Sequence, residues 1–297
     1  MTDHLTIAHI SDLHFSKFSF QITQFFSKRW LGNLNLLLNR KHDYVKERPF
    51  SLIEAFKQHH VTDVIVSGDV TTTSFKKEYH LIQQFTNTLK EQGCHVYLIP
   101  GNHDHYTRHA YRTKLFYNYF DSQFDKTIPY NLKDHQITGK KLSNGWWLIA
   151  IDTTLATHLY SANGYFSREI EEHLQKLLIR IPRNEKILLV NHFPFFQHES
   201  PRRRLKRGEV LEKIIKKHPN IQLYLHGHTH RRCVADLRKN GLPIILDSGS
   251  VGHRLGSFSL ISLSQNQCDL DVYQWQGSNW DRIEQYHFTW DKEGQTL

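Results

Sequence analysis

Cysteine, methionine and long apolar runs are scarce in this chain of 297 residues, which has 3 cysteines and 1 methionine. Cys94, Cys233 and Cys268 lie far apart and form no Cys-x-x-Cys pair, which argues against a disulfide framework and a thiolate zinc site. The apolar run at residues 5–10 is shorter than a signal-peptide core and far shorter than the roughly 20 residues that cross a bilayer. We therefore expect a reduced, cytoplasmic protein that would meet a membrane only at its surface.

Glycine and proline are also few, at 15 and 8 residues, which argues against a fibrous chain. The hydrophobic fraction of 39% is too high for a disordered chain. Basic residues outnumber acidic ones, with 38 Lys and Arg and 29 Asp and Glu. The formal net charge is therefore +9 when the 22 His are counted as neutral. This surplus indicates an acidic partner, such as nucleic acid or an anionic membrane. The sequence has no repeat and no long linker, so we expect residues 1–297 to form a single domain.

Short aliphatic runs alternate with helical patterns along the chain. Strands are predicted at residues 5–10, 64–66, 95–99, 147–151, 187–190, 223–225, 243–246, 258–263, 269–275 and 286–290. Helices are predicted at residues 49–60, 76–91, 167–178 and 208–217, with Ser167 as a capping residue. This order is typical of an α/β enzyme whose site lies at the ends of its strands.

Five polar clusters follow predicted strands and carry carboxylate, amide and imidazole groups but no sulfur. They are Asp12-Leu13-His14, Gly68-Asp69, Gly101-Asn102-His103-Asp104, Asn191-His192 and Gly227-His228-Thr229-His230. Mixed nitrogen and oxygen donors suit borderline divalent ions better than Ca²⁺. One cluster alone is more often a hydrogen-bonded histidine or a capped turn. Five clusters together favour a metal site, and their number favours two ions over one.

The order of these motifs resembles that of the calcineurin-like metallophosphoesterase family, from Asp12 to His230. The resemblance implies an α/β fold, a four-layer α/β/β/α sandwich, with two divalent ions. Mn²⁺ is the first choice, and Mg²⁺, Fe²⁺ and Zn²⁺ are alternatives. One ion would take Asp12, His14, Asp69 and His230, and the other would take Asp69, Asn102, His192 and His228.

The resemblance also implies catalytic roles for two residues of the third cluster. His103 would face the phosphoryl oxygen or the leaving group, and Asp104 would orient it. The chain departs from the family pattern after Asp69, where many relatives carry an acidic or amide residue and this chain has Val70 followed by three threonines. We expect this difference to change how the ligands are supported and not to abolish metal binding.

Residues 17–47 form a predicted insert that is basic and hydrophobic. No acidic residue lies between Asp12 and Asp43, and apolar residues recur at helical spacing, with Phe26, Trp30 and Leu34 as candidate substrate contacts. A basic amphipathic helix of this kind lies well at an anionic bilayer surface. The alternative is a cap helix that packs on the core.

Two further segments are candidates for binding substrate. Aromatic residues recur along residues 106–120, which we expect to be helical. They include Tyr111 and indicate either core packing or a wall for an acyl chain. The basic run that begins with Arg202, Arg203 and Arg204 lies between two histidine clusters, so contact with phosphate or anionic lipid competes with a merely solvated loop.

Within the family, residues 27–37 resemble the LpxG type of UDP-2,3-diacylglucosamine pyrophosphatase. This resemblance implies hydrolysis of UDP-2,3-diacylglucosamine to UMP and 2,3-diacylglucosamine 1-phosphate, in lipid A biosynthesis. The expected partners are a nucleotide-linked glycolipid and an anionic membrane surface, with no nucleic acid, at the cytoplasmic face of the inner membrane. The alternative is a cyclic-nucleotide or general phosphodiesterase of the same family, and the oligomeric state is left open.

Overall fold

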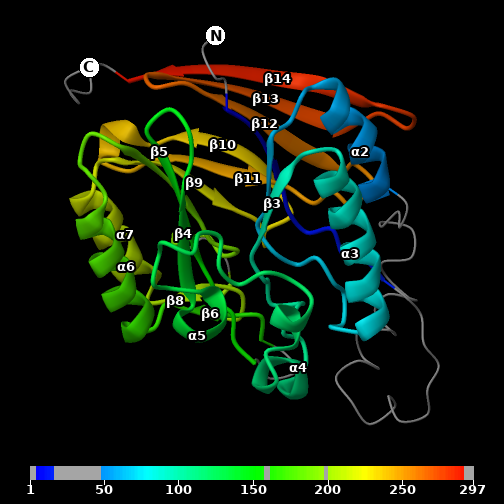
Figure 1. The fold of residues 1–297 in the computed structure, drawn as a ribbon, viewed down its shortest axis with the longest axis horizontal. Coiled ribbons are helices and arrows are strands. Elements are labelled where there is room, and N and C mark those ends of the chain that lie inside the picture. The colour runs from blue at the N-terminus through cyan, green and yellow to red at the C-terminus, as the bar shows by residue number, and fades with distance from the viewer. Residues whose placement is uncertain (1–4, 17–47, 157–160, 197–199, 291–297) are drawn as a thin grey trace.

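The computed structural model describes residues 5–16, 48–156, 161–196 and 200–290. Two six-stranded sheets pack face to face, and helices cover the outer face of each (Figure 1). The predicted insert at residues 17–47 lies outside the described residues. Across the part of the chain that is described, no helix combines the length and apolar character needed to span a bilayer.

The first sheet has the strand order β14-β13-β12-β1-β2-β3. Its strands are β1 (Leu5–Ile10), β2 (Asp63–Val66), β3 (His95–Leu98), β12 (Ser257–Leu263), β13 (Gln267–Trp275) and β14 (Trp280–Thr289). The neighbours β1, β2 and β3 run parallel, whereas β12, β13 and β14 are joined as antiparallel strands. The final strand, predicted at residues 286–290, therefore begins earlier than its aromatic alternation indicated.

The second sheet has the order β10-β11-β9-β7-β5-β4. Its strands are β4 (Ile137–Lys141), β5 (Trp146–Ile151), β7 (Lys186–Val190), β9 (Ile221–His226), β10 (Arg232–Asp236) and β11 (Ile244–Ser248). The central strands β5, β7, β9 and β11 are parallel, and the edge strands β4 and β10 are antiparallel to their neighbours. A small parallel pair joins β6 (Gly164–Tyr165) to β8 (Leu205–Lys206).

Four longer helices have bounds close to those predicted. They are α2 (Arg48–Gln58), α3 (Lys76–Glu91), α6 (Arg168–Arg180) and α7 (Gly208–Lys217). Ser167 caps α6, since its hydroxyl accepts a hydrogen bond from the amide of Ile170. Short helical segments complete the described elements: α4 (Arg108–Arg112), α5 (Leu132–His135), and the 3-10 helices Leu115–Asn118 and Arg238–Asn240.

Side-chain alternation along the strands builds three apolar layers. In β1, Ile7 faces the second sheet, whereas Ala8 and Ile10 pack with α2 and α3. In β7, Leu188 faces the first sheet and Leu189 packs with α6 and α7. Because successive side chains of a strand point to opposite faces, the central strands of each sheet are buried on both sides, whereas the edge strands β10 and β14 are largely exposed. The four-layer α/β/β/α sandwich is confirmed.

The aromatic segment at residues 106–120 is helical only in part. Lys114 has a left-handed backbone, with φ of 48°, and it separates α4 from the following 3-10 helix. Leu115 and Phe116 are buried, and Phe116 packs on Tyr79 of α3. For these residues core packing is the observed role.

Candidate metal centre

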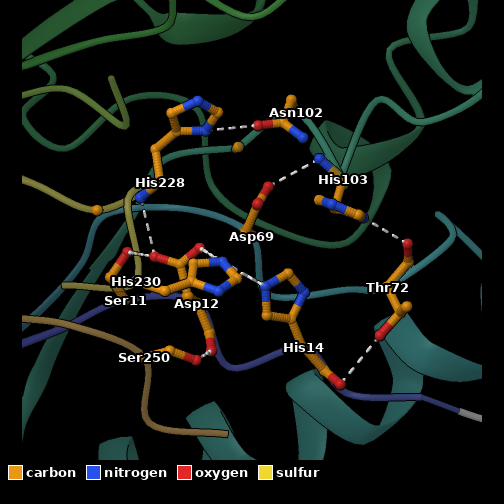
Figure 2. Close-up of polar contacts among 12 residues, drawn as sticks. Ser11, Asp12, His14, Asp69, Thr72, Asn102, His103, His228, His230 and Ser250 are labelled. Atoms are coloured by element: carbon orange, nitrogen blue, oxygen red, sulfur yellow. Dashed lines mark hydrogen bonds and ion pairs between the residues drawn. The ribbon is translucent and has the colours of Figure 1, made fainter. Parts of the chain in front are cut away.

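The polar clusters meet at one edge of the sandwich, where the parallel strands of both sheets end. The candidate ligands lie in the loops after these strands: Asp12 and His14 after β1, Asp69 after β2, Asn102 after β3, His192 after β7, and His228 and His230 after β9. Parallel strands deliver their carboxyl ends to the same edge of a sheet. Figure 2 labels all of these residues except His192, and the labelled ligands point toward a common centre.

The backbone at this centre is strained. Five of the seven candidate ligands have left-handed φ values, which are 53° at Asp12, 47° at His14, 51° at Asp69, 70° at His228 and 57° at His230. Such values are uncommon for residues other than glycine, and they persist only where surrounding contacts impose them. Here the amide of Asp12 donates to the carbonyl of Gly68 and the amide of His14 donates to the carbonyl of Asp69, each at 3.0 Å. The β1 and β2 loops therefore hold each other in the conformation that aims the side chains inward.

Asp12, His14, Asp69 and His230 form a first donor group, whose ligand atoms all lie within 4.8 Å of one another. Nε2 of His230 lies 3.0 Å from Oδ1 of Asp12 and 3.1 Å from Nε2 of His14. The other oxygen of Asp12, Oδ2, accepts hydrogen bonds from the hydroxyl of Ser11 and the amide of His228. One carboxylate oxygen is thus fixed by the protein, and the other faces two imidazoles.

Asp69, His192 and His228 form a second donor group, which shares Asp69 with the first. Oδ1 of Asp69 accepts the amide of His103 at 2.7 Å, whereas Oδ2 lies 3.4 Å from Nε2 of His192. The amide oxygen of Asn102 lies between the two imidazoles, 2.9 Å from Nδ1 of His228 and 3.3 Å from Nε2 of His192. The shared carboxylate therefore links two adjacent sets of donors.

Backbone carbonyls fix which nitrogen of each imidazole faces the centre. Nδ1 of His192 lies 2.8 Å from the carbonyl of Ser67, and Nε2 of His228 lies 2.7 Å from the carbonyl of Arg203. A carbonyl can only accept, so these nitrogens carry a proton and the opposite nitrogens face the centre. Burial lowers the pKa of His228 to about 3, which keeps its ring neutral.

The donor set fits two divalent cations. Burial favours the neutral form of Asp12, but the imidazoles of His230 and His14 hold the pKa of this carboxyl well below its ordinary value. Burial likewise opposes the charged form of His192, yet the Asp69 carboxylate raises the pKa of this ring to about 9. Two ionised carboxylates in a buried place require positive charge nearby. Mixed imidazole, carboxylate and amide donors suit Mn²⁺, Fe²⁺ or Zn²⁺.

Two glycines allow the loops to approach this closely. A Cβ on Gly101 would lie 2.2 Å from Oδ1 of Asp69, and one on Gly227 would lie 1.8 Å from the hydroxyl oxygen of Ser11. Any larger residue would displace the acceptors that position the carboxylates.

His103 and Asp104 do not interact as expected. Nδ1 of His103 lies 2.8 Å from the carbonyl oxygen of Thr72, which orients the ring. The carboxylate of Asp104 instead accepts the amides of Val70, Thr71 and Gly101. The expectation that Asp104 orients the ring of His103 is therefore wrong, because its oxygens are occupied by the β2 and β3 loops. Asp104 acts on the site through the backbone.

The three threonines after Val70 stabilise the loop that carries Asp69, although this loop lacks the acidic or amide residue that many relatives have there. The hydroxyl of Thr71 donates to Asp104 at 2.8 Å, and that of Thr72 donates to the carbonyl of His14 at 3.0 Å. Thr73 bonds to Glu78 at the start of α3. Short hydroxyl side chains thus tie the β2 loop to its neighbours on three sides.

The basic run reaches the centre through one arginine. The guanidinium of Arg203 donates to the carbonyl of His228 at 3.2 Å, in addition to the contact between its own carbonyl and that ring. Arg202 and Arg204 are exposed, and their backbones bond to Ala162, Asn163 and Gly164. Of the three candidates, Arg203 alone contacts a candidate ligand among the residues that the structure describes.

Tyr111 lies apart from the donor groups. Its ring packs against the buried His105, with 5.6 Å between ring centroids, and no contact with a candidate ligand is found in the described ranges. Phe26, Trp30 and Leu34 belong to the segment outside those ranges. Their roles as substrate contacts stay predictions.

Sequence reasoning missed several residues that hold the site together. The hydroxyl of Ser250 donates to the carbonyl of Asp12 at 2.7 Å (Figure 2). Asp247 accepts the hydroxyl of Thr229 at 2.5 Å, which fixes the turn between His228 and His230. One feature of the sequence could have indicated Asp247. It stands at the end of an apolar strand, and the ligands Asp12 and Asp69 likewise follow closely after apolar strands.

Two donor groups that share a carboxylate, at the edge of a four-layer sandwich, define the architecture of dimetal phosphoesterases. The family described as calcineurin-like phosphoesterase matches residues 5–232. The chain belongs to this family.

Relatives by sequence include a 3',5'-cyclic-nucleotide phosphodiesterase from Nostoc sp., 22% identical over 171 residues, which are 57% of this chain and 55% of that protein. Another, from Arcobacter nitrofigilis, is named probable glycerophosphodiester phosphodiesterase GpdQ; it is 26% identical over 195 residues, 65% of this chain and 64% of that protein. The matches thus span less than two thirds of either relative.

Solved structures support the fold. A dimetal phosphatase from Danio rerio has a TM-score of 0.60 at 13% identity, with 97% of this chain and 99% of that chain covered. The purple acid phosphatase PPD1 from yellow lupin has a TM-score of 0.63 at 11% identity, with 97% of this chain and 54% of that chain covered. At such low identity, these likenesses concern the fold alone.

We predict that Asp69→Asn lowers the divalent metal content of the purified protein from about two ions per chain to one or none, because both donor groups lose their common charge. Elemental analysis by mass spectrometry measures this. Asp121→Asn, at an exposed aspartate, is the control and should keep the full metal content. Full metal content in Asp69→Asn would contradict the shared role.

We predict that His103→Asn keeps the metal content and lowers kcat by about 10²- to 10⁴-fold, the range expected when a positioned proton donor is removed. His109→Asn, at an exposed histidine of α4, is the matched control. Elemental analysis and steady-state kinetics on bis(p-nitrophenyl) phosphate check both variants. A kcat within threefold of wild type would exclude the role of His103.

Proposed function

We propose that the protein is a metal-dependent phosphodiesterase, the alternative that the sequence left open. The observation that carries this proposal is the carboxylate of Asp69, which belongs to both donor groups. Asp12, His14, Asp69 and His230 would hold one ion, and Asp69, Asn102, His192 and His228 the other. Divalent ions bound there would lower the pKa of water and neutralise charge on the phosphoryl oxygens. The relatives from Nostoc and Arcobacter, both named as phosphodiesterases, support the same reaction class.

The chain's own residues would orient the reaction and move one proton. The carbonyl of Thr72 keeps a proton on Nδ1 of His103, so proton exchange with substrate falls to Nε2. In its protonated form this nitrogen would donate to the alkoxide that leaves phosphorus. The carbonyls of Ser67 and Arg203 would keep His192 and His228 from rotating during turnover. Neither role needs a covalent intermediate with the enzyme.

We predict that the Mn²⁺-loaded protein hydrolyses bis(p-nitrophenyl) phosphate with a kcat/KM at least tenfold above that for p-nitrophenyl phosphate, a monoester. The visible absorbance of the released p-nitrophenolate measures the hydrolysis of both esters. Hydrolysis of 3',5'-cAMP, followed by chromatography, tests whether cyclic diesters are accepted. Asp69→Asn should be inactive on every substrate. A preference for the monoester would overturn the proposal.

A second candidate is hydrolysis of UDP-2,3-diacylglucosamine to UMP and 2,3-diacylglucosamine 1-phosphate. It is supported by the resemblance of residues 27–37 to the LpxG type, by the basic and apolar composition of residues 17–47, and by the guanidinium of Arg203 beside His228. Under this proposal the surplus charge of +9 would draw the protein to the cytoplasmic face of an anionic membrane. Phe26, Trp30 and Leu34 would then contact lipid.

We predict for this candidate that the radiolabelled glycolipid in detergent is cleaved, and that Trp30→Glu weakens sedimentation with anionic vesicles at least fivefold, since it places a negative charge on an apolar membrane-facing side chain. The matched control is Ile179→Glu, at a side chain of α6 that is 81% exposed, and it should leave sedimentation unchanged. If the glycolipid is not cleaved while the diesters still are, this second candidate is excluded and the phosphodiesterase proposal stands.

A further inference from the structure

The ring of Tyr106 lies nearly flat against the ring of His103, next to the candidate metal centre. The two ring centroids are 5.4 Å apart, and the ring planes are 14° from parallel. This is the geometry of an offset stack, one of the arrangements that pairs of aromatic rings prefer. Both side chains are half-buried, so the pair lies at the boundary between the core and the solvent.

We propose that Tyr106 is a positioning residue, which holds the imidazole of His103 in the orientation that presents Nε2 to the leaving group. The inference rests on the proposed phosphodiesterase function, in which His103 supplies a proton to the leaving alkoxide. The third motif cluster ends at Asp104, two residues before Tyr106, and so assigns this tyrosine no role. Three observations support the proposal: the freedom that the ring of His103 would otherwise keep, its second ring contact, and the fixed turn that leads to Tyr106.

A single hydrogen bond leaves the ring of His103 free to tilt. Nδ1 of this ring donates to the carbonyl of Thr72 at 2.8 Å (Figure 2). A carbonyl oxygen accepts over a broad range of directions, and the outer side-chain torsion of histidine has broad minima. The ring can therefore tilt while this bond is kept. The stack on Tyr106 opposes the tilt, because tilting would separate the two ring faces.

A second ring contact relates His103 to the first donor group. The ring of His14, a candidate ligand, packs at 90° to the ring of His103, with 5.0 Å between centroids. The orientation of His103 is thus defined by one perpendicular ring and one nearly parallel ring. Since His14 belongs to the donor group, loss of the Tyr106 ring would let Nε2 of His103 move relative to the metal centre.

The turn between His103 and Tyr106 is fixed by α3 and the loop before it. The hydroxyl of Ser74 donates to the carbonyl of His103 and accepts the amide of Tyr106, each at 2.8 Å. Between these two residues, the carbonyl of Asp104 accepts the hydroxyl of Tyr79 at 2.6 Å. One serine side chain therefore holds the backbones that carry both rings. The stack is formed in advance of substrate binding, as the support of a reacting group requires.

Three single variants test the role of the ring. Tyr106→Leu should lower kcat on bis(p-nitrophenyl) phosphate about tenfold with KM within twofold of wild type, because a small misplacement of a reacting group slows the chemical step. Tyr106→Phe keeps the ring and should keep kcat within twofold. Tyr165→Leu, at a tyrosine of β6 that is 37% exposed, is the matched control and should change neither constant. Elemental analysis should give full metal content for all three, which separates a displaced ring from a disrupted site.

A double-mutant cycle tests whether Tyr106 acts through His103. In the His103→Asn background, Tyr106→Leu should change kcat less than twofold, because the ring that Tyr106 positions is already absent. A further tenfold loss in that background would overturn the proposal. A raised KM with unchanged kcat in Tyr106→Leu would also overturn it, since Tyr106 would then be a contact for substrate.

Nuclear magnetic resonance gives a measurement that does not depend on turnover. In protein with isotopically labelled histidine, loaded with diamagnetic Zn²⁺, the Nδ1 proton signal of His103 is the one that vanishes in His103→Asn. This proton should exchange with water at least tenfold faster in Tyr106→Leu than in wild type or Tyr106→Phe, because a tilting ring breaks the bond to Thr72. Equal exchange rates would overturn the proposal. If the wild-type protein hydrolyses no diester, the proposed function fails, and the exchange rates still decide whether Tyr106 holds the ring.

Discussion

The site depends on two carboxylates, Asp12 and Asp69, that stay ionised in a buried place. Each uses one oxygen to accept donors from the protein and turns the other toward imidazoles. Removing a carboxylate from water is costly unless positive charge or several donors compensate for it. The histidines and the donating amides supply this compensation. The glycines and the left-handed turns let the loops that carry these groups come close enough to do so. A divalent cation is the partner that such an arrangement fits best.

The fold brings these groups together because both sheets send parallel strands to one edge. The first donor group takes three of its members from the first sheet and His230 from the second, so neither sheet holds a complete site. The apolar layer between the sheets, which includes Ile7 and Leu188, fixes their relative position. The alignment of the two donor groups is therefore a consequence of core packing, and substitutions in that layer would reach the site without touching a ligand.

Much of the fold and most candidate ligands could be predicted from the sequence, because both depend on local patterns. The alternation of strand and helix patterns predicted the α/β class, the family resemblance implied the two sheets, and the clusters after strands contained the seven donors that the structure brings together. The edge strands β4 and β10 were not predicted. The partner of Asp104 could not be predicted, since a carboxylate next to His103 in sequence instead accepts amides from residues more than thirty positions away. The helix expected through residues 106–120 failed at Lys114, where tertiary packing of Phe116 outweighed helical spacing. Long-range hydrogen bonds and local breaks leave little trace in a single sequence.

The last strands of the chain are part of the site, although the motifs end at His230. Ser250 bonds to the backbone of Asp12, and Asp247 fixes the turn through Thr229, so the segment after β11 supports both the carboxylate and the final histidines. Burial and the negative charge of Asp12 raise the pKa of Asp247 well above its ordinary value. The Thr229 hydroxyl and the Gly249 amide offset part of that cost by donating to it. Because Asp247 and Ser250 follow the last motif residue in the sequence, the ligands within the motifs depend on a segment that the motifs do not include. Substitutions there would shift the Asp12 carboxylate and the final histidines while every motif residue stays in place, since residues that only orient the ligands still set the geometry of a metal site.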